Sequence, residues 1–95
     1  MARWNKGQAR ASTQTAACIL QRAIRAMRET IERELHVARG EVAFWREFAG
    51  AAVGVYSPGE VARIITAHDM AQRRLERLER MLSRLDDSDG PAAGA

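Results

Sequence analysis

The chain is poor in the residues that would cross-link it or hold it in a membrane. Its single cysteine, Cys18, excludes a disulfide within the chain and fits a reducing compartment best. Aromatic residues make up only 5% of the chain, and no apolar run reaches the roughly 18 residues that a membrane-spanning helix needs. The first residues also lack the apolar segment of a signal peptide. We therefore expect a cytoplasmic protein without a transmembrane segment.

Motifs that carry chemistry are missing as well. The sequence contains no glycine-rich phosphate loop and no HExxH, CxxC or GxSxG. Glu32 and His36 lie four residues apart and could share a metal ion, but no third ligand follows nearby, so a solvated ion pair is the better interpretation. We predict a protein that is not an enzyme and that holds no cofactor or metal.

Acidic residues are absent from the first 28 positions. This segment carries the candidate contacts to nucleic acid or another anion, which are Arg3, Trp4, Lys6, Arg10, Arg22, Arg25 and Arg28. Cations together with an aromatic ring can bind nucleic-acid backbones and bases. An exposed chain end without a ligand would have the same composition, so both interpretations stay open. The other end is acidic, with Asp86, Asp87 and Asp89.

The second half of the chain has the pattern of one long helix. Ser57 and Glu60 form a Ser-x-x-Glu capping box with Pro58 at the first helical position, so a helix should begin there. Alternating steps of three and four residues then define an apolar seam: Val61, Ile64, His68, Ala71, Leu75, Leu78, Leu82 and Leu85. His68 could fix the register or make assembly pH-dependent, or it could be satisfied by solvent or a neighbouring side chain.

The first half also has helical spacing, with one irregularity. Its seam runs through Ala17, Leu20, Ile24, Met27, Ile31, Leu35, Ala38, Val42, Trp45, Ala49 and Ala52. Two successive steps of four, from Met27 to Ile31 and from Ile31 to Leu35, form a stutter that locally unwinds a coiled coil without ending it. Gly40 lies off this seam and could allow a bend. Phe44 and Phe48 also lie off the seam and are candidates for a surface that binds a protein partner.

These elements predict an all-α fold, an antiparallel helical hairpin with a coiled-coil-like heptad seam that assembles into a helical bundle. We expect a basic arm at residues 1–12, helices at about 13–50 and 58–86, a glycine-bearing hinge at about 51–57, and a disordered acidic tail at 87–95. The first helix is longer than the second and should project beyond it. A lone hairpin buries little apolar surface, which favours a homo-oligomer, most simply a four-helix dimer.

Three functions fit this layout. The first is a structural or adaptor protein that self-associates through its seams and presents a helical surface to a protein partner. The second is a sequence-tolerant nucleic-acid-binding accessory protein, and the layout is similar to that of small terminase subunits of phages and of plasmid accessory proteins, although no motif is shared. The third is an amphipathic helix at residues 10–31 that lies on a membrane surface. The ridge of Arg73, Arg77, Arg80 and Arg84 fits a solvated helix face with Glu76 and Glu79, and alternatively a second anion contact.

Overall fold

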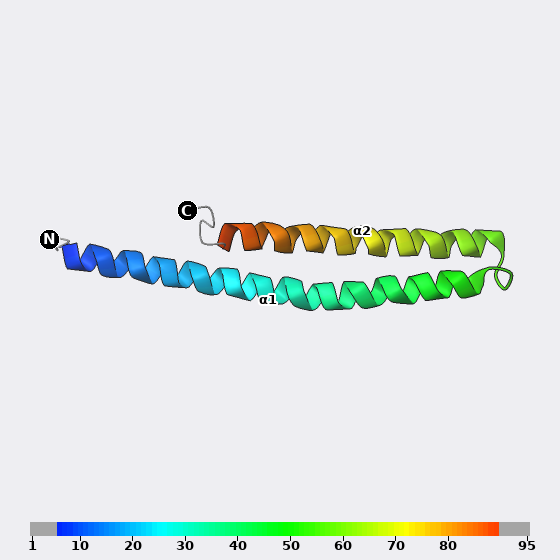
Figure 1. Cartoon of the computed structure of the whole chain (residues 1–95), viewed down its shortest axis with the longest axis horizontal. Helices are drawn as coiled ribbons and strands as arrows, with labels where there is room; N and C mark the ends of the chain where they lie inside the picture. The colour runs from blue at the N-terminus through cyan, green and yellow to red at the C-terminus, as the bar shows by residue number, and fades with distance from the viewer. Residues whose placement is uncertain (1–5, 90–95) are drawn as a thin grey trace.

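The protein is an elongated helical hairpin, as the sequence pattern predicts. The computed structural model describes the backbone of residues 6–89 and the side chains of residues 13–87. In this part of the chain, helix α1 (Lys6–Ala52) and helix α2 (Pro58–Asp89) run antiparallel beside each other (Figure 1). The molecule measures 77 × 33 × 15 Å. Its radius of gyration is 22.5 Å, against about 12 Å for a compact chain of this length.

Both helices extend further than the sequence indicates. α1 begins at Lys6 and not near residue 13, so part of the expected arm at 1–12 is helical, and α2 continues to Asp89 into the expected tail at 87–95. The segment 6–12 contains no proline and several good helix formers, which lets the helix extend without a seam. Residues 1–5 and 90–95 lie outside the described residues. α1 passes through Gly40 without a break and curves gently along its length (Figure 1).

The reversal between the helices is shorter than expected and uses one glycine. It spans residues 53–57, where Gly54 adopts a φ of +83° that other residues rarely take. The carbonyl of Ala52 accepts hydrogen bonds from the backbone N–H groups of Val55, at 3.1 Å, and Tyr56, at 3.0 Å. These bonds satisfy one of the carbonyls that the end of a helix leaves without a partner.

The predicted capping box forms at the start of α2. The backbone N–H of Glu60 donates to the Ser57 hydroxyl, and the backbone N–H of Ser57 donates to a Glu60 carboxylate oxygen, each at 3.3 Å. The first helical hydrogen bond, from the N–H of Val61 to the carbonyl of Ser57, measures 2.9 Å. Two donors at the helix end are thus satisfied reciprocally, which fixes where α2 begins.

The core lies between the middle portions of the two helices. Ile31, Leu35 and Ala38 of α1 pack with Leu78 of α2 in one cluster, and Leu35 is only 2% exposed. Leu75, Leu82 and Leu85 pack against this cluster while remaining partly exposed. Val42, Ala52, Ile64 and Ala71 are also buried, towards the hinge. From Ile31 onward, the seam of α1 is therefore used inside the hairpin.

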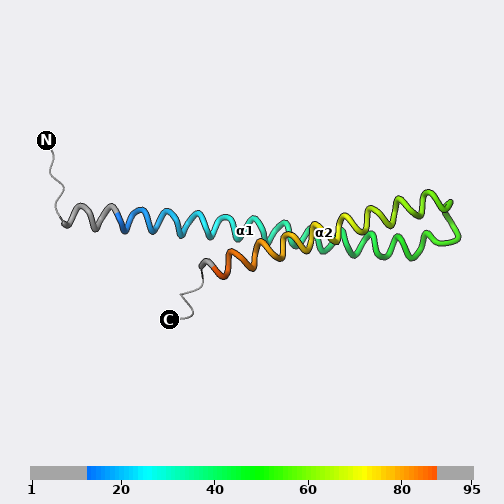
Figure 2. Tube along the Cα trace, turned by 90° about the horizontal axis from the view of Figure 1, so that it is seen from above, coloured from blue at the N-terminus to red at the C-terminus, as the bar shows by residue number. Residues whose placement is uncertain are grey.

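Two ion pairs join the helices and show their register. The Arg28 guanidinium lies 3.0 Å from Asp86, and the Arg74 guanidinium lies 3.4 Å from Glu41. In an antiparallel pair, one helix counts up where the other counts down, so Arg28 faces Asp86 and Glu41 faces Arg74. By the same count, Asp89 at the end of α2 lies opposite residue 25 or 26 of α1. The portion of α1 before residue 25 therefore projects beyond α2, as Figures 1 and 2 show. At 1.5 Å per residue, residues 6–24 extend about 28 Å.

Candidate interaction surfaces

The aromatic side chains in the described part of the chain gather near the closed end of the hairpin. The ring of Phe44 lies 5.2 Å from that of Trp45 and 5.8 Å from that of Phe48, and Tyr56 extends the group at 5.8 Å from Phe48. Phe44 is 56% exposed, while Trp45 and Phe48 are half-buried. Aromatic clusters that are held in place yet exposed are frequent centres of protein interfaces. The two predicted partner residues, Phe44 and Phe48, thus lie together.

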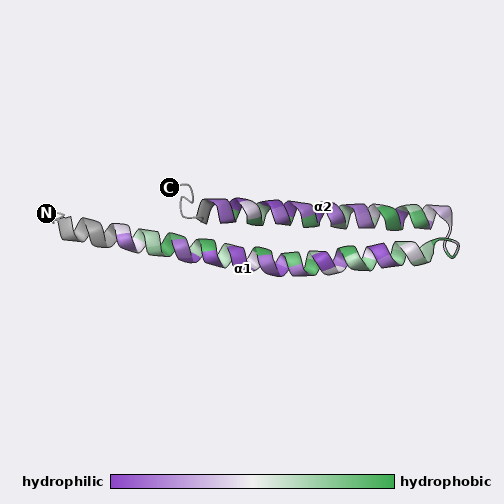
Figure 3. Cartoon of the chain, in the orientation of Figure 1, coloured by the Kyte–Doolittle hydropathy of each residue, from purple (hydrophilic) through white to green (hydrophobic). Residues whose placement is uncertain are grey.

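The projecting part of α1 has apolar residues without a partner in the hairpin. Every described side chain from Thr13 to Ala23 is exposed, including Ile19 at 60% and Leu20 at 61%. Of the seam residues that follow, Ile24 is half-buried and Met27 is exposed. Hydrophobic bands continue along α1 past the end of α2 (Figure 3). Leu20 and Met27 therefore belong to the seam by spacing but are not covered by α2.

The predicted anion contacts on α1 differ in whether they form an ion pair within the hairpin. Arg22 and Arg25 are exposed on the projecting part and form no ion pair with the described residues. Arg28 differs, because Asp86 of α2 neutralises it at 3.0 Å. The antiparallel register brings the acidic end of α2 to the last basic residue of this segment. The side chains of Arg3, Trp4, Lys6 and Arg10 lie outside the described residues.

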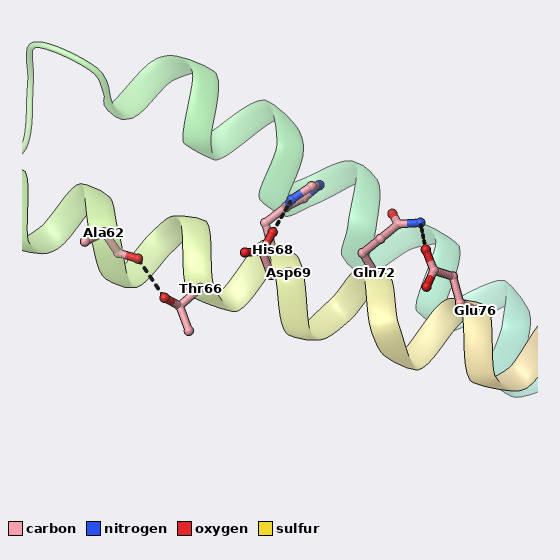
Figure 4. Close-up of polar contacts among 6 residues, drawn as sticks. All are labelled: Ala62, Thr66, His68, Asp69, Gln72 and Glu76. Atoms are coloured by element: carbon pink, nitrogen blue, oxygen red, sulfur yellow. Dashed lines mark hydrogen bonds and ion pairs between the residues drawn. The ribbon is translucent and has the colours of Figure 1, made fainter.

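The arginine ridge on α2 lacks some of the carboxylate partners that its sequence offers. Arg73, Arg77 and Arg80 are exposed and form no ion pair in the described part of the chain. Glu76 accepts a hydrogen bond from the Gln72 amide at 3.2 Å (Figure 4). Arg74, which lies outside the ridge, pairs with Glu41 across the helices. Arg73, Arg77 and Arg80 are therefore exposed to solvent on a helix face that also carries exposed Glu76 and Glu79.

His68 is the polar residue of the seam, and one of its nitrogens has no partner. Its side chain extends from α2 toward α1 (Figure 4), and Nε2 is buried without a hydrogen bond. Nδ1 lies 3.8 Å from an Asp69 carboxylate oxygen, which is too long for a hydrogen bond. No described side chain satisfies Nε2, and the role of His68 in register or pH-dependent assembly stays a prediction.

The described residues include one free cysteine and no cluster of candidate metal ligands. No group of three or more His, Cys, Asp or Glu side chains in that part of the chain could hold a metal ion. Cys18 is exposed on the projecting part of α1 as a free thiol. Neither described helix is both long and apolar enough to cross a membrane.

Two exposed apolar residues were not predicted as surface residues from the sequence. Met70 on α2 is 64% exposed, and Ile19 on α1 is nearly as open. Both lie beside the seam, where a search for one heptad repeat does not look. The cross-helix pair of Glu41 and Arg74 also depends on the register, which no local pattern specifies. A search of each helix for a second repeat would have found Ile19.

Comparison with protein-family models, with curated proteins and with solved structures finds no match to this chain.

Proposed function

We propose that the protein is a non-enzymatic structural or adaptor protein that self-associates and presents a helical surface to a protein partner. The exposed apolar surface of the hairpin is the observation that carries this proposal. Large hydrophobic side chains are exposed along both helices, among them Ile19, Leu20, Met27, Val37, Phe44, Ile65, Met70 and Met81. A molecule whose shortest dimension is 15 Å has no second layer that could cover them. Many exposed apolar side chains on one extended hairpin favour binding to another protein or to a second copy.

Self-association and partner binding use neighbouring regions of the hairpin that meet at Phe44 in this proposal. The seam between Ile31 and Ala52 is occupied by α2, so a second copy must bind elsewhere on α1. The aromatic cluster of Phe44, Trp45, Phe48 and Tyr56 lies near the closed end, away from the projecting part. A second copy can therefore bind along α1 as far as Phe44, whereas Phe48 and Tyr56 lie beyond it, at the closed end, for a partner.

Nucleic-acid binding is the second candidate function. The segment 13–28 has three arginines and no acidic residue, and Arg22 and Arg25 are exposed without an ion pair to the described residues. Arg73, Arg77 and Arg80 add positive charge on α2. Arginines of this kind bind phosphates without reading sequence.

Light scattering on the purified chain, with and without nucleic acid at two salt concentrations, tests these functions against each other. The adaptor proposal expects a mass that is a multiple of 10.6 kDa. This mass should change little with salt, because apolar contacts are weakly screened. A monomer at every concentration contradicts self-association. Nucleic-acid binding that weakens by decades between about 50 and 200 mM salt supports the second candidate instead.

A capture experiment with two variants tests the partner surface. Phe44→Ala removes an exposed ring from the aromatic cluster, whereas Ile65→Ala removes an exposed aliphatic side chain from α2. A protein that the wild type retains should be lost with Phe44→Ala and kept with Ile65→Ala. Equal loss in both variants contradicts a specific role for the aromatic cluster.

A further inference from the structure

α1 carries a second stripe beside the seam. It advances by alternating steps of four and three residues and consists of Ile19, Ala23, Ala26, Thr30, Arg33, Val37, Gly40 and Phe44. All eight residues are exposed, and the three largest apolar ones are more than half exposed. Most members immediately precede a seam residue, as Ile19 precedes Leu20 and Phe44 precedes Trp45. One residue is a rotation of about 100° around the helix, so the second stripe faces sideways from α2.

Two stripes at this angle are what a helix needs to face two neighbours. In a four-helix bundle, each helix contacts the two helices next to it and buries a broad apolar face. α2 is the neighbour that the seam of α1 faces from Ile31 onward. No described residue covers the second stripe, which lacks its neighbour in the single chain.

The two polar side chains of the second stripe are bonded within α1. The Thr30 hydroxyl donates to the carbonyl of Ala26 at 3.0 Å, and the Arg33 guanidinium donates to the Thr30 hydroxyl at 3.3 Å. A hydroxyl that bonds its own helix can be covered without losing its partner. The small residues Ala23, Ala26 and Gly40 also permit close approach of another helix, since nothing lies within 4 Å of a Cβ built on Gly40.

The distribution of charge along α1 identifies the occupant. Residues 13–28 carry three arginines and no acid, whereas residues 29–47 carry five glutamates and three arginines. A second α1 in the antiparallel direction places the basic half of each copy beside the acidic half of the other. A parallel second copy would place like charge beside like charge, which disfavours that arrangement.

We propose that the second stripe of α1 packs against the same stripe of a second copy, antiparallel, with the two-fold axis between residues 28 and 32. This inference rests on the proposed self-association and specifies its surface. In this register, Ile19 of each copy lies opposite Val37 or Phe44 of the other. Large side chains then meet near the ends of the contact, and the small residues Ala26 and Thr30 lie at its centre.

The contact extends beyond one pair of helices. Glu41 precedes Val42 and so lies on the side of the second stripe, and its bond to Arg74 shows which side of α2 faces the same way. A groove on this side is lined by Trp45, Ala67, Met70 and Ala71 together with charged residues. The projecting part of the second copy passes over this groove and covers Met70. The result is a four-helix dimer with α2 on the outside of each copy.

The distance between spin labels on Cys18 tests the arrangement directly in the full chain. Cys18 is the only cysteine, it is exposed, and it lies on neither stripe. With the axis between residues 28 and 32, the two labels should be separated by about 30–45 Å, from the helical rise and the spacing of packed helices. A pair that joins only the tips of the projecting parts, or a parallel pair, places the labels within about 20 Å. Either short distance overturns the proposal.

A pair of matched variants provides the second measurement. Ala26→Glu places a glutamate on the second stripe near the axis, and Ala43→Glu makes the same change at an exposed alanine about 100° around α1 from the stripe and away from α2. Ala26→Glu should raise the dissociation constant of the dimer about tenfold or more, because a longer side chain holds apart two helices that meet at small residues. Ala43→Glu should leave it within about twofold.

The outcomes separate this inference from the function on which it rests. Both variants should keep the helical circular dichroism of the wild type when dilute, because both positions are exposed in the hairpin. If the wild type is a dimer but Ala26→Glu and Ala43→Glu weaken it equally, the second stripe is not the contact, while self-association stands. If the wild type stays monomeric, both the inference and the proposed self-association are wrong.

Discussion

Replacement of Leu35 by alanine should remove a large part of the stability of the hairpin. Leu35 is 2% exposed and lies in the cluster with Ile31, Ala38 and Leu78. Leucine-to-alanine changes at buried sites reduce the free energy of unfolding by about 2–5 kcal/mol. The core here is one layer thick, and its neighbours Leu75 and Leu82 are partly exposed, so water and side chains can fill the space. We therefore expect the lower end of this range, about 2–3 kcal/mol.

Urea denaturation followed by far-ultraviolet circular dichroism measures this loss. The same substitution at Leu20 is the matched control, because Leu20 belongs to the same seam of α1 as Leu35 but is 61% exposed. At a protein concentration low enough for the monomer, Leu20→Ala should change the free energy of unfolding by no more than about 0.5 kcal/mol. Equal losses at the two positions would refute the assignment of the core to the overlap of the two helices.

Three other substitutions test details of the hairpin. His68→Leu should raise the free energy of unfolding by about 1–2 kcal/mol, because it removes a buried nitrogen without a partner; thermal denaturation should show no comparable gain for the exposed His36→Leu. Ser57→Ala should cost about 1 kcal/mol in urea denaturation through loss of the cap, whereas Ser57→Asp should keep it. Gly54→Ala should destabilise the hairpin by about 1 kcal/mol because of its positive φ, and Gly50→Ala, inside α1 with open space around it, should stabilise it by about as much; a reversed order would contradict the geometry of the turn.

The sequence predicts the hairpin because its local signals agree with one another. The capping box at Ser57 fixes the start of α2, and the unbroken alternation from Val61 to Leu85 defines its buried side. The doubled step of four at Ile31 and Leu35 does not prevent both residues from being buried. These features depend only on spacing along one helix, which a sequence displays directly.

Features that depend on the relation between the two helices could not be predicted in the same way. The spacing assigns Leu20 and Met27 to the seam, and only the register shows that α2 ends before it covers them. The same register brings Asp86 to Arg28 and Arg74 to Glu41. The fold thereby neutralises Arg28, one of the predicted anion contacts, with a carboxylate from the acidic end of the chain.

The candidate surfaces were predicted in part. Phe44 and Phe48 stood out as apolar residues away from the seam, and the structure adds Trp45 and Tyr56 to the same cluster. A pattern with one apolar repeat per helix does not include the second stripe, because half of its members, such as Ala23 and Ala26, are small. Small residues carry little hydrophobic signal in a sequence although they permit close helix packing.

Hydrogen exchange of the full chain at two protein concentrations tests the central claim most directly, namely that α1 is covered by α2 over only part of its length and by a second copy over the remainder. Amides of residues 31–49 and 61–85 should be protected in both samples, because they lie in the hairpin. Amides of residues 13–27 should exchange freely when the protein is dilute and become protected as its concentration rises. Protection of residues 13–27 in the dilute monomer, or free exchange of these residues at every concentration, would contradict the claim.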